Sequence, residues 1–149
     1  MAFQFSLQAL LRWRQVREDR EKLRLSALTA HLLHTRTLYE EQDRSRRQAG
    51  RDLADFMKSG MVASEVHFDV AGLEGDTRRL KALSADVKKI EQARQVQQDA
   101  YVDAKKKRES LESLRTHQLD AYRLVQGRRE QQRVDDLFAV RRGSKAQSS

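Results

Sequence analysis

The sequence contains no cysteine, no proline and only 6 glycines among its 149 residues. Without cysteine the chain has no disulfide framework, no thiol nucleophile and no thiolate metal site. Sandwiches and barrels need many glycine and proline turns, and disordered chains are usually rich in proline. These absences point away from both classes and toward long helices.

Apolar residues are also scarce. Hydrophobic residues make up 38% of the chain, charged residues make up 35%, and the mean hydropathy is −0.84. Such a composition is too polar for a sizeable round core. No apolar run reaches the length of about 18 residues that a membrane span needs. Because Arg12 and Arg14 interrupt the first apolar stretch, we expect no signal peptide and a cytoplasmic location.

Apolar residues recur at alternating spacings of three and four, which is typical of a coiled-coil seam. One series runs over residues 25–56 and a second over residues 80–111. Beyond the second series two phases compete, one through Leu114 and Ala121 and the other through Tyr122. The spacing therefore predicts two long helices.

The break between the two series predicts a turn. Lys58-Ser59-Gly60 is typical of a helix end, with Gly60 in the left-handed conformation. Ser64 followed by Glu65 is typical of a helix start, and Asp69 is an alternative start. Because the break is short, the second helix is expected to fold back against the first.

The predicted fold class is all-α, a long two-helix antiparallel coiled-coil hairpin. Pairing about a centre near residue 62 sets Leu11 against about residue 113, and the longer second helix extends past the N-terminus. Polar residues in the seam are expected to lower stability and fix the register. The predicted parts are a single domain over 1–141 (helix about 3–58, turn about 59–64, helix about 65–140) and a disordered basic tail over 142–149.

Charge is distributed unevenly along the chain. Residues 1–24 and 105–149 together carry a net charge of +9, whereas residues 25–104 carry −1. Both termini lie at one end of a hairpin, so the excess positive charge is expected at that end. This asymmetry predicts different partners at the two ends.

The sequence has no motif for catalysis: no phosphate-binding glycine loop, no HExxH and no GxSxG. His31 and His34 are spaced to share a metal, but no carboxylate nearby in sequence completes the set, so we interpret both as solvated. A two-helix rod also offers no concave pocket that would shift carboxylate pKa values. We therefore expect no enzymatic activity, no cofactor and no metal site.

Basic clusters and unburied apolar residues remain. The basic residues either form a solvated helix face with salt pairs or bind an acidic protein or nucleic acid. Trp13 falls outside the seam and forms a second stripe with Phe3 and Leu10. Near the turn, apolar residues either staple the turn or form an adaptable docking surface. These are Met57, Met61, Val66 and Phe68.

The two ends of the sequence resemble those of flagellar FliJ proteins. The opening run Met1–Arg12 is similar to the Phe-x-Phe-x-Leu-x-x-Leu-Leu run, followed by arginines, with which members of that family often begin. Residues Gly127–Leu137 and the basic tail resemble the family's basic, Glu/Gln-rich last helix with its acidic-apolar turn. Length, absence of cysteine and two-helix layout match across the whole chain.

This resemblance implies a fold and a role. FliJ proteins are antiparallel coiled coils similar to the rotor stalk of rotary ATPases, and they act in flagellar type III protein export. They associate with the export ATPase FliI and with FliH, bind the export gate protein FlhA and interact with export chaperones. The resemblance therefore implies a non-enzymatic protein without a small-molecule substrate, peripheral at the cytoplasmic face of the inner membrane.

Charge and exposure, rather than family motifs, give the candidate contact residues. The terminal end is expected to enter the ATPase ring through a basic and aromatic set: Arg12, Trp13, Arg14, Arg17, Arg128, Arg129 and Arg133. The half near the turn is expected to contact the export gate through Tyr39, Met57, Met61 and Phe68.

Three alternatives stay open. A basic helical hairpin that binds nucleic acid would show steep salt dependence and little dependence on Trp13. Interspersed acidic residues and the lack of a base-stacking platform count against it. A scaffold coiled coil would homo-oligomerise through the second stripe. A virulence-type secretion stalk shares the architecture, although the run from Phe3 to Leu11 favours the flagellar branch.

Overall fold

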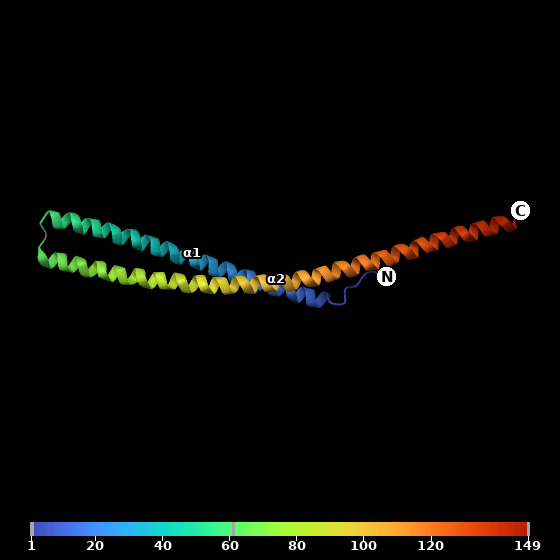
Figure 1. The fold of residues 1–149 in the computed structure, drawn as a ribbon, viewed down its shortest axis with the longest axis horizontal. Helices are drawn as coiled ribbons and strands as arrows, with labels where there is room; N and C mark the ends of the chain where they lie inside the picture. The colour runs from blue at the N-terminus through green and yellow to red at the C-terminus, as the bar shows by residue number, and fades with distance from the viewer. Residues whose placement is uncertain (1, 61, 149) are drawn as a thin grey trace. The chain divides into compact units, whose positions relative to one another are not determined.

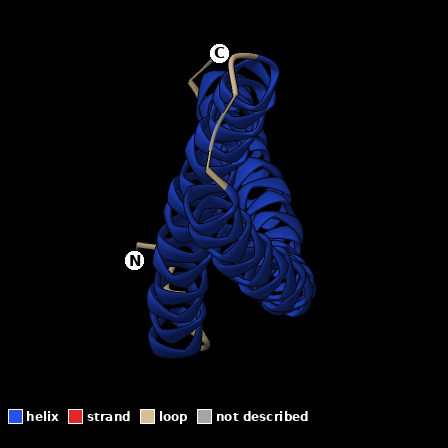
Figure 2. Cartoon of the chain, turned by 90° about the vertical axis from the view of Figure 1, so that its left-hand side faces the viewer, coloured by secondary structure: helices blue, strands red, loops and turns tan. Residues whose placement is uncertain are grey.

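A computed structural model of the chain describes residues 2–60 and 62–148. Helix α1 covers Gln8–Lys58 and helix α2 covers Ala63–Gln147 (Figure 1). Figure 2 shows helices and loops, and no strand, in this described part of the chain. The two helices pack against each other in antiparallel orientation, so the predicted all-α hairpin is confirmed.

Contacts between the helices group into two compact units. Met1–Glu18 and Ala104–Ser149 form one, which we name the terminal unit, and Asp19–Asp103 form the other, the turn unit. Both helices run through both units. A single domain over residues 1–141 therefore stays a prediction, and the two units are described separately below.

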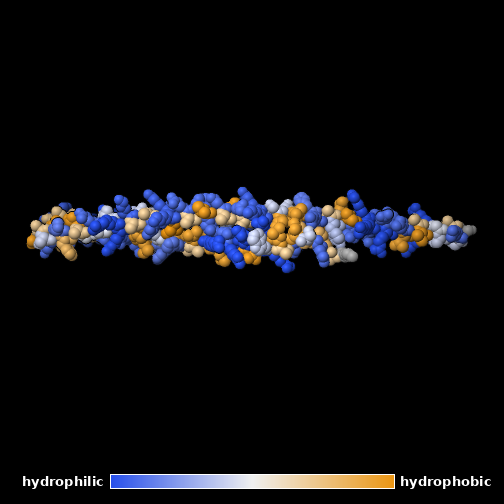
Figure 3. Space-filling model, turned by 90° about the horizontal axis from the view of Figure 1, so that it is seen from below, coloured by the Kyte–Doolittle hydropathy of each residue, from blue (hydrophilic) through white to orange (hydrophobic). Residues whose placement is uncertain are grey.

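The turn unit is held by the predicted seam. Leu32, Thr35, Leu53 and Leu80 are buried, and the remaining seam positions over residues 25–46 are half-buried. Helices with one buried stripe leave their other faces in water, as the many hydrophilic residues on the surface in Figure 3 show. The core is therefore a line of single side chains rather than a layer.

Polar contacts between the helices set the register of the turn unit. Arg46 Nε donates to Thr77 Oγ1 at 2.9 Å, and Arg36 forms an ion pair with Glu91. Gln97 Nε2 donates to the Glu21 backbone oxygen at 3.0 Å. The pairs Arg46–Thr77 and Arg36–Glu91 are close to symmetric about residue 62, which agrees with the predicted register, whereas Gln97 reaches along the helix to Glu21.

The turn follows the predicted ending of the first helix but not the predicted start of the second. Helix α1 ends at Lys58, and Gly60 has φ +93°, the left-handed conformation that favours glycine. Helix α2 begins at Ala63, where the Val62 carbonyl accepts from the Glu65 amide at 3.0 Å. A backbone carbonyl opens this helix, so the predicted cap at Ser64 and the alternative start at Asp69 are wrong, whereas Glu65 lies in the first turn as predicted. Ser64 lies inside the first turn.

In the terminal unit, α1 begins at Gln8 and not near residue 3. The preceding segment is non-helical, and Phe5 within it is buried, with 7% of its surface exposed. The Phe3 ring lies 5.7 Å from the Tyr122 ring, centroid to centroid. The non-helical segment thus carries a ring that packs on Tyr122 of α2 and a second, buried ring, and the helix starts later than predicted.

The contact of Phe3 with Tyr122 also decides between the two seam phases. Tyr122 is half-buried, whereas Leu114 and Ala121 are exposed. Half-burial of Leu119 and Gln126 continues the same stripe. The phase through Tyr122 is therefore the one that faces the N-terminal segment.

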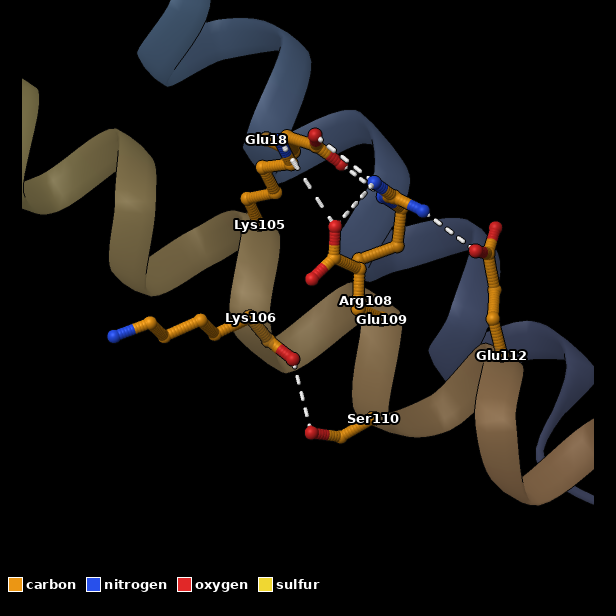
Figure 4. Close-up of polar contacts among 7 residues, drawn as sticks. All are labelled: Glu18, Lys105, Lys106, Arg108, Glu109, Ser110 and Glu112. Atoms are coloured by element: carbon orange, nitrogen blue, oxygen red, sulfur yellow. Dashed lines mark hydrogen bonds and ion pairs between the residues drawn. The ribbon is translucent and has the colours of Figure 1, made fainter.

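A charged fork joins the helices of the terminal unit (Figure 4). Arg108 of α2 donates to both carboxylate oxygens of Glu18 of α1, with Nη2 at 3.3 Å from Oε1. Arg108 Nη1 also donates to Glu112 Oε2 at 2.6 Å. Only 19% of the Arg108 side chain and 13% of the Glu18 side chain are exposed. The hydrogen bond to Glu18 raises the pKa of the Arg108 guanidinium above its ordinary value.

The C-terminal part of α2 differs from the prediction. The helix continues to Gln147, through most of the 142–149 segment that we predicted to be a disordered tail. Every described residue from Gly127 to Ser148 is exposed, as expected for a second helix that extends past the N-terminal segment. No proline interrupts the segment, and a single internal glycine such as Gly143 costs only about 1 kcal/mol, which does not end a helix.

The first testable prediction concerns Arg94 in the seam of the turn unit. Its Nε is buried and has no hydrogen-bond partner in the described part of the chain. Such a group costs about 1–3 kcal/mol, so Arg94→Met is expected to stabilise the protein by about 1 kcal/mol and raise Tm by about 2–4 °C. Thermal unfolding followed by circular dichroism measures this. The control Lys88→Met removes the same charge at an exposed position, and an equal gain there would contradict the explanation.

The second prediction concerns the charged fork. Arg108→Gln and Glu18→Gln should each destabilise the protein by about 1.5–3 kcal/mol, because each leaves a mostly buried charged partner without its bond. The double variant should cost less than the two single effects added together, with a coupling of about 1 kcal/mol. Urea unfolding of all four proteins measures the cycle. Arg115→Gln, at an exposed position, should change stability by less than about 0.5 kcal/mol, and strict additivity at the fork would refute the coupling.

Candidate functional site

All the residues predicted to contact an ATPase ring lie in the terminal unit. This unit contains 15 Lys and Arg residues against 7 Asp and Glu, whereas the turn unit contains 15 of each. The net charge of +8 therefore resides entirely in the terminal unit. A surface with this excess attracts acidic partners at long range and speeds their association.

Trp13 is the centre of an exposed cation–aromatic cluster at the start of α1. Its side chain is 49% exposed, as predicted from its position outside the seam. The guanidinium carbons of Arg14 and Arg17 lie 4.9 and 5.3 Å from the ring centroid. These cation–π contacts hold a flat apolar ring and two positive charges together on one face. Arg12 is exposed beside them.

The second stripe is smaller than predicted. Leu10 and Val16 are exposed at helical spacing from Trp13, at 38% and 50%. Phe3, which we placed on this stripe, instead lies in the non-helical segment, and its ring packs on Tyr122. The apolar residues exposed at helical spacing around Trp13, namely Leu10 and Val16, therefore both belong to α1.

The other predicted ring contacts lie on the exposed end of α2. Arg128, Arg129 and Arg133 are solvent-exposed, and Arg133 pairs with Glu130 at 3.6 Å. They follow Tyr122, and no interaction among the described residues joins them to the Trp13 cluster. The structure therefore presents the predicted set as two separate basic surfaces of the terminal unit.

An apolar stripe accompanies these arginines and was missed in the sequence. Val134, Leu137 and Phe138 are exposed at 37%, 63% and 57%. Their spacing of three and four places them on one face of α2. The same spacing rule that revealed the seams could have found this stripe. We name residues 127–147 of α2 the α2 extension.

Near the turn, Phe56, Met57 and Phe68 are exposed at 58%, 54% and 78%. Stapling of the turn would bury them, so their exposure favours the docking interpretation for Met57 and Phe68. Two of these residues line a groove of about 440 Å³, whose lining is Phe56, Ser64, Glu65, Phe68 and Asp69. We expected Phe56 to lie inside the seam and missed its role in this groove.

The remaining members of the predicted gate contact lie elsewhere. Tyr39 is half-buried at a seam position and does not line the groove beside Phe68. Met61 lies outside the described residues. Of the predicted gate set, Met57 and Phe68 are therefore exposed near the turn, on α1 and α2 respectively, and only Phe68 of the described members lines the groove.

His31 and His34 are exposed and line a shallow groove of about 570 Å³ with Asp86 and Lys89. Over residues 2–60 and 62–148, no group of three or more His, Cys, Asp or Glu is arranged to hold a metal ion. No described helix has an apolar stretch long enough to cross a membrane. The features available for function are thus the exposed surfaces described above.

Comparison with known protein families adds a direct assignment. The family model described as "Flagellar FliJ protein" matches residues 3–148. The matched region includes both ends of the chain and both helices. No curated protein and no solved structure gives a significant match. The chain belongs to the flagellar FliJ family, and its role lies in flagellar protein export.

Proposed function

We propose that this protein is the non-enzymatic central stalk of the flagellar type III export apparatus. Its terminal unit engages the ring of the export ATPase FliI, and its turn unit contacts the export gate protein FlhA. Association with FliH and with export chaperones, at the cytoplasmic face of the inner membrane, belongs to the same proposal. The observation that carries it is the confinement of the net charge of +8 to the terminal unit.

The α2 extension suits a contact inside a ring. A single helix with its side chains is about 10–12 Å wide, which is narrower than a helix pair. Arg128, Arg129 and Arg133 project from this helix without cover from α1. Exposed guanidinium groups form bidentate pairs with carboxylates, so acidic side chains lining a ring are their natural partners. The Trp13 cluster supplies a second contact on α1.

The turn unit suits transmission over a distance. Its α1 part spans residues 19–58, or about 60 Å at 1.5 Å per residue. Cross-helix contacts such as Arg46–Thr77 and Gln97–Glu21 resist sliding of one helix along the other. A helix pair locked in register in this way can carry a change in position from one contact to another without any chemistry of its own.

The third prediction tests the ring contact. We expect the variant Arg128→Glu/Arg129→Glu/Arg133→Glu to stimulate FliI ATPase activity at least about tenfold less than the wild type does, because it reverses the charge of the α2 extension. Circular dichroism should show unchanged helicity. The control Arg44→Glu/Lys81→Glu/Lys88→Glu makes the same change in net charge at exposed positions of the turn unit and should stimulate like the wild type.

Unchanged stimulation by the first triple variant would count against the extension as the ring contact. Trp13→Ala provides a second arm, since loss of its indole should weaken stimulation without unfolding an exposed site. RNA binding that falls steeply with salt and ignores Trp13→Ala, in the absence of ATPase stimulation, would favour the nucleic-acid alternative.

The fourth prediction tests the gate contact. Met57→Ala/Phe68→Ala should weaken binding to FlhA by about tenfold or more and leave ATPase stimulation intact, because both side chains are exposed beside the turn. Leu33→Ala/Val96→Ala is the control, since it removes two exposed apolar side chains elsewhere in the turn unit. Equal binding by both double variants and the wild type would refute this assignment.

A further inference from the structure

The groove beside the turn is lined by two exposed aromatic residues, Phe56 and Phe68, together with acidic residues. It adjoins a second groove of about 310 Å³ that shares Phe56, Phe68 and Asp69 with it. The lining of the two grooves contains four acidic residues and no Lys or Arg among the residues described. The acidic residues are Asp52, Glu65, Asp69 and Asp76. We name this surface the turn groove.

Two of these four carboxylates have no side-chain partner within the described part of the chain. Asp76 pairs with Arg79 at 3.6 Å, and Asp52 accepts from Gln48 Nε2 at 2.9 Å. Glu65 and Asp69 have neither an ion-pair nor a side-chain hydrogen-bond partner there. Both line the first groove together with Phe68, and 78% of the surface of Phe68 is exposed. The turn groove therefore fits an apolar side chain flanked by positive charge.

The α2 extension has this chemistry. At helical spacing, the stripe of Val134, Leu137 and Phe138 continues into Arg141 and Lys145 on the same face. Between residues 127 and 147 the extension carries six basic residues against three acidic ones, and Asp136 falls on the side opposite the stripe. Figure 3 shows apolar residues next to hydrophilic ones along this end of α2. No described residue of α1 covers it.

We propose that the protein self-associates, with the α2 extension of one copy docked in the turn groove of a second copy. Leu137 and Phe138 pack beside Phe56 and Phe68, and basic residues of the extension lie opposite Glu65 and Asp69. This is the helix-in-groove mode, in which apolar residues spaced three and four apart anchor an amphipathic helix. The contact joins different surfaces of the two copies, so it is heterologous.

Self-association of this kind has a functional consequence. The α2 extension contains Arg128, Arg129 and Arg133, which we assign to the ring contact. The turn groove contains Phe68, which we assign to the gate contact. A copy bound through both surfaces is therefore held away from both partners. The docking itself rests only on the two surfaces and stands or falls independently of the export role.

The fifth prediction tests the docking with the full chain in analytical ultracentrifugation at physiological salt. The wild type should increase in average mass with concentration up to about 100 µM. Two variants should each self-associate at least about tenfold more weakly than the wild type. They are the groove variant Glu65→Lys/Asp69→Lys and the extension variant Arg133→Glu/Arg141→Glu. Controls with matched charge changes, Glu40→Lys/Glu41→Lys and Arg115→Glu/Arg123→Glu, alter exposed residues outside both surfaces and should behave like the wild type.

Mixing the two variants provides the decisive arm. Each retains one native surface, and the new lysines of one complement the new glutamates of the other, so the equimolar mixture should assemble again. The variants have net charges of +12 and +4, both positive, so general attraction between them does not produce assembly. A monomeric wild type, a mixture that stays monomeric or equal loss in the controls would overturn the proposal. The proposal would also be overturned if Trp13→Ala abolished self-association while the groove variant still self-associated. That result would place the contact on the exposed α1 stripe around Trp13.

Discussion

The narrow seam between α1 and α2 is the constraint on which the rest of this structure depends. In a pair of helices, each helix can bury only one stripe of its surface. The core is therefore a single row of side chains, which includes Leu11, Leu32 and Leu80. Apolar packing in a single file fixes the register weakly, because a slip by one heptad restores similar contacts. Polar side chains supply the missing specificity. Hydrogen bonds join Arg108 to Glu18 and Gln97 to Glu21 across the two helices. A slip of one helix along the other would leave these polar groups without their partners.

The same constraint leaves most side chains of the described residues on the surface. The grooves beside Phe68 and beside His31 are depressions lined by side chains of both helices. What differs along the molecule is the chemistry of these surfaces. The terminal unit holds the whole excess of positive charge, whereas Phe56 and Phe68 with their acidic neighbours mark the end near the turn. Family membership assigns the chain to flagellar protein export, and this division of charge is the basis of our proposal that it connects two partners.

Structural features that depend on residues close together in the sequence could be predicted. Features that depend on contacts between residues far apart in the sequence could not. The seam positions from Leu25 to Arg46, the left-handed Gly60 and the exposure of Trp13 follow from helical spacing and turn chemistry. Phe3 lies outside the helical pattern, in a segment where its ring packs on Tyr122, a residue far away in sequence. The turn groove was missed because a seam position predicts burial, and Phe56 has such a position yet remains exposed.

The α2 extension shows how stability and binding are linked in this fold. Residues 127–147 lack a partner helix, contain Gly127 and Gly143, and leave Leu137 and Phe138 in water. Isolated helices of this length are marginal in water, since most helical stability in proteins comes from packing of an apolar face. Covering the stripe therefore stabilises the helix as well as the complex. A partner that buries Leu137 and Phe138, whether an ATPase ring or a second copy, gains affinity from residues that contribute nothing to the hairpin itself. Selection for binding can consequently act on the extension without changing the seam that holds the two helices in register.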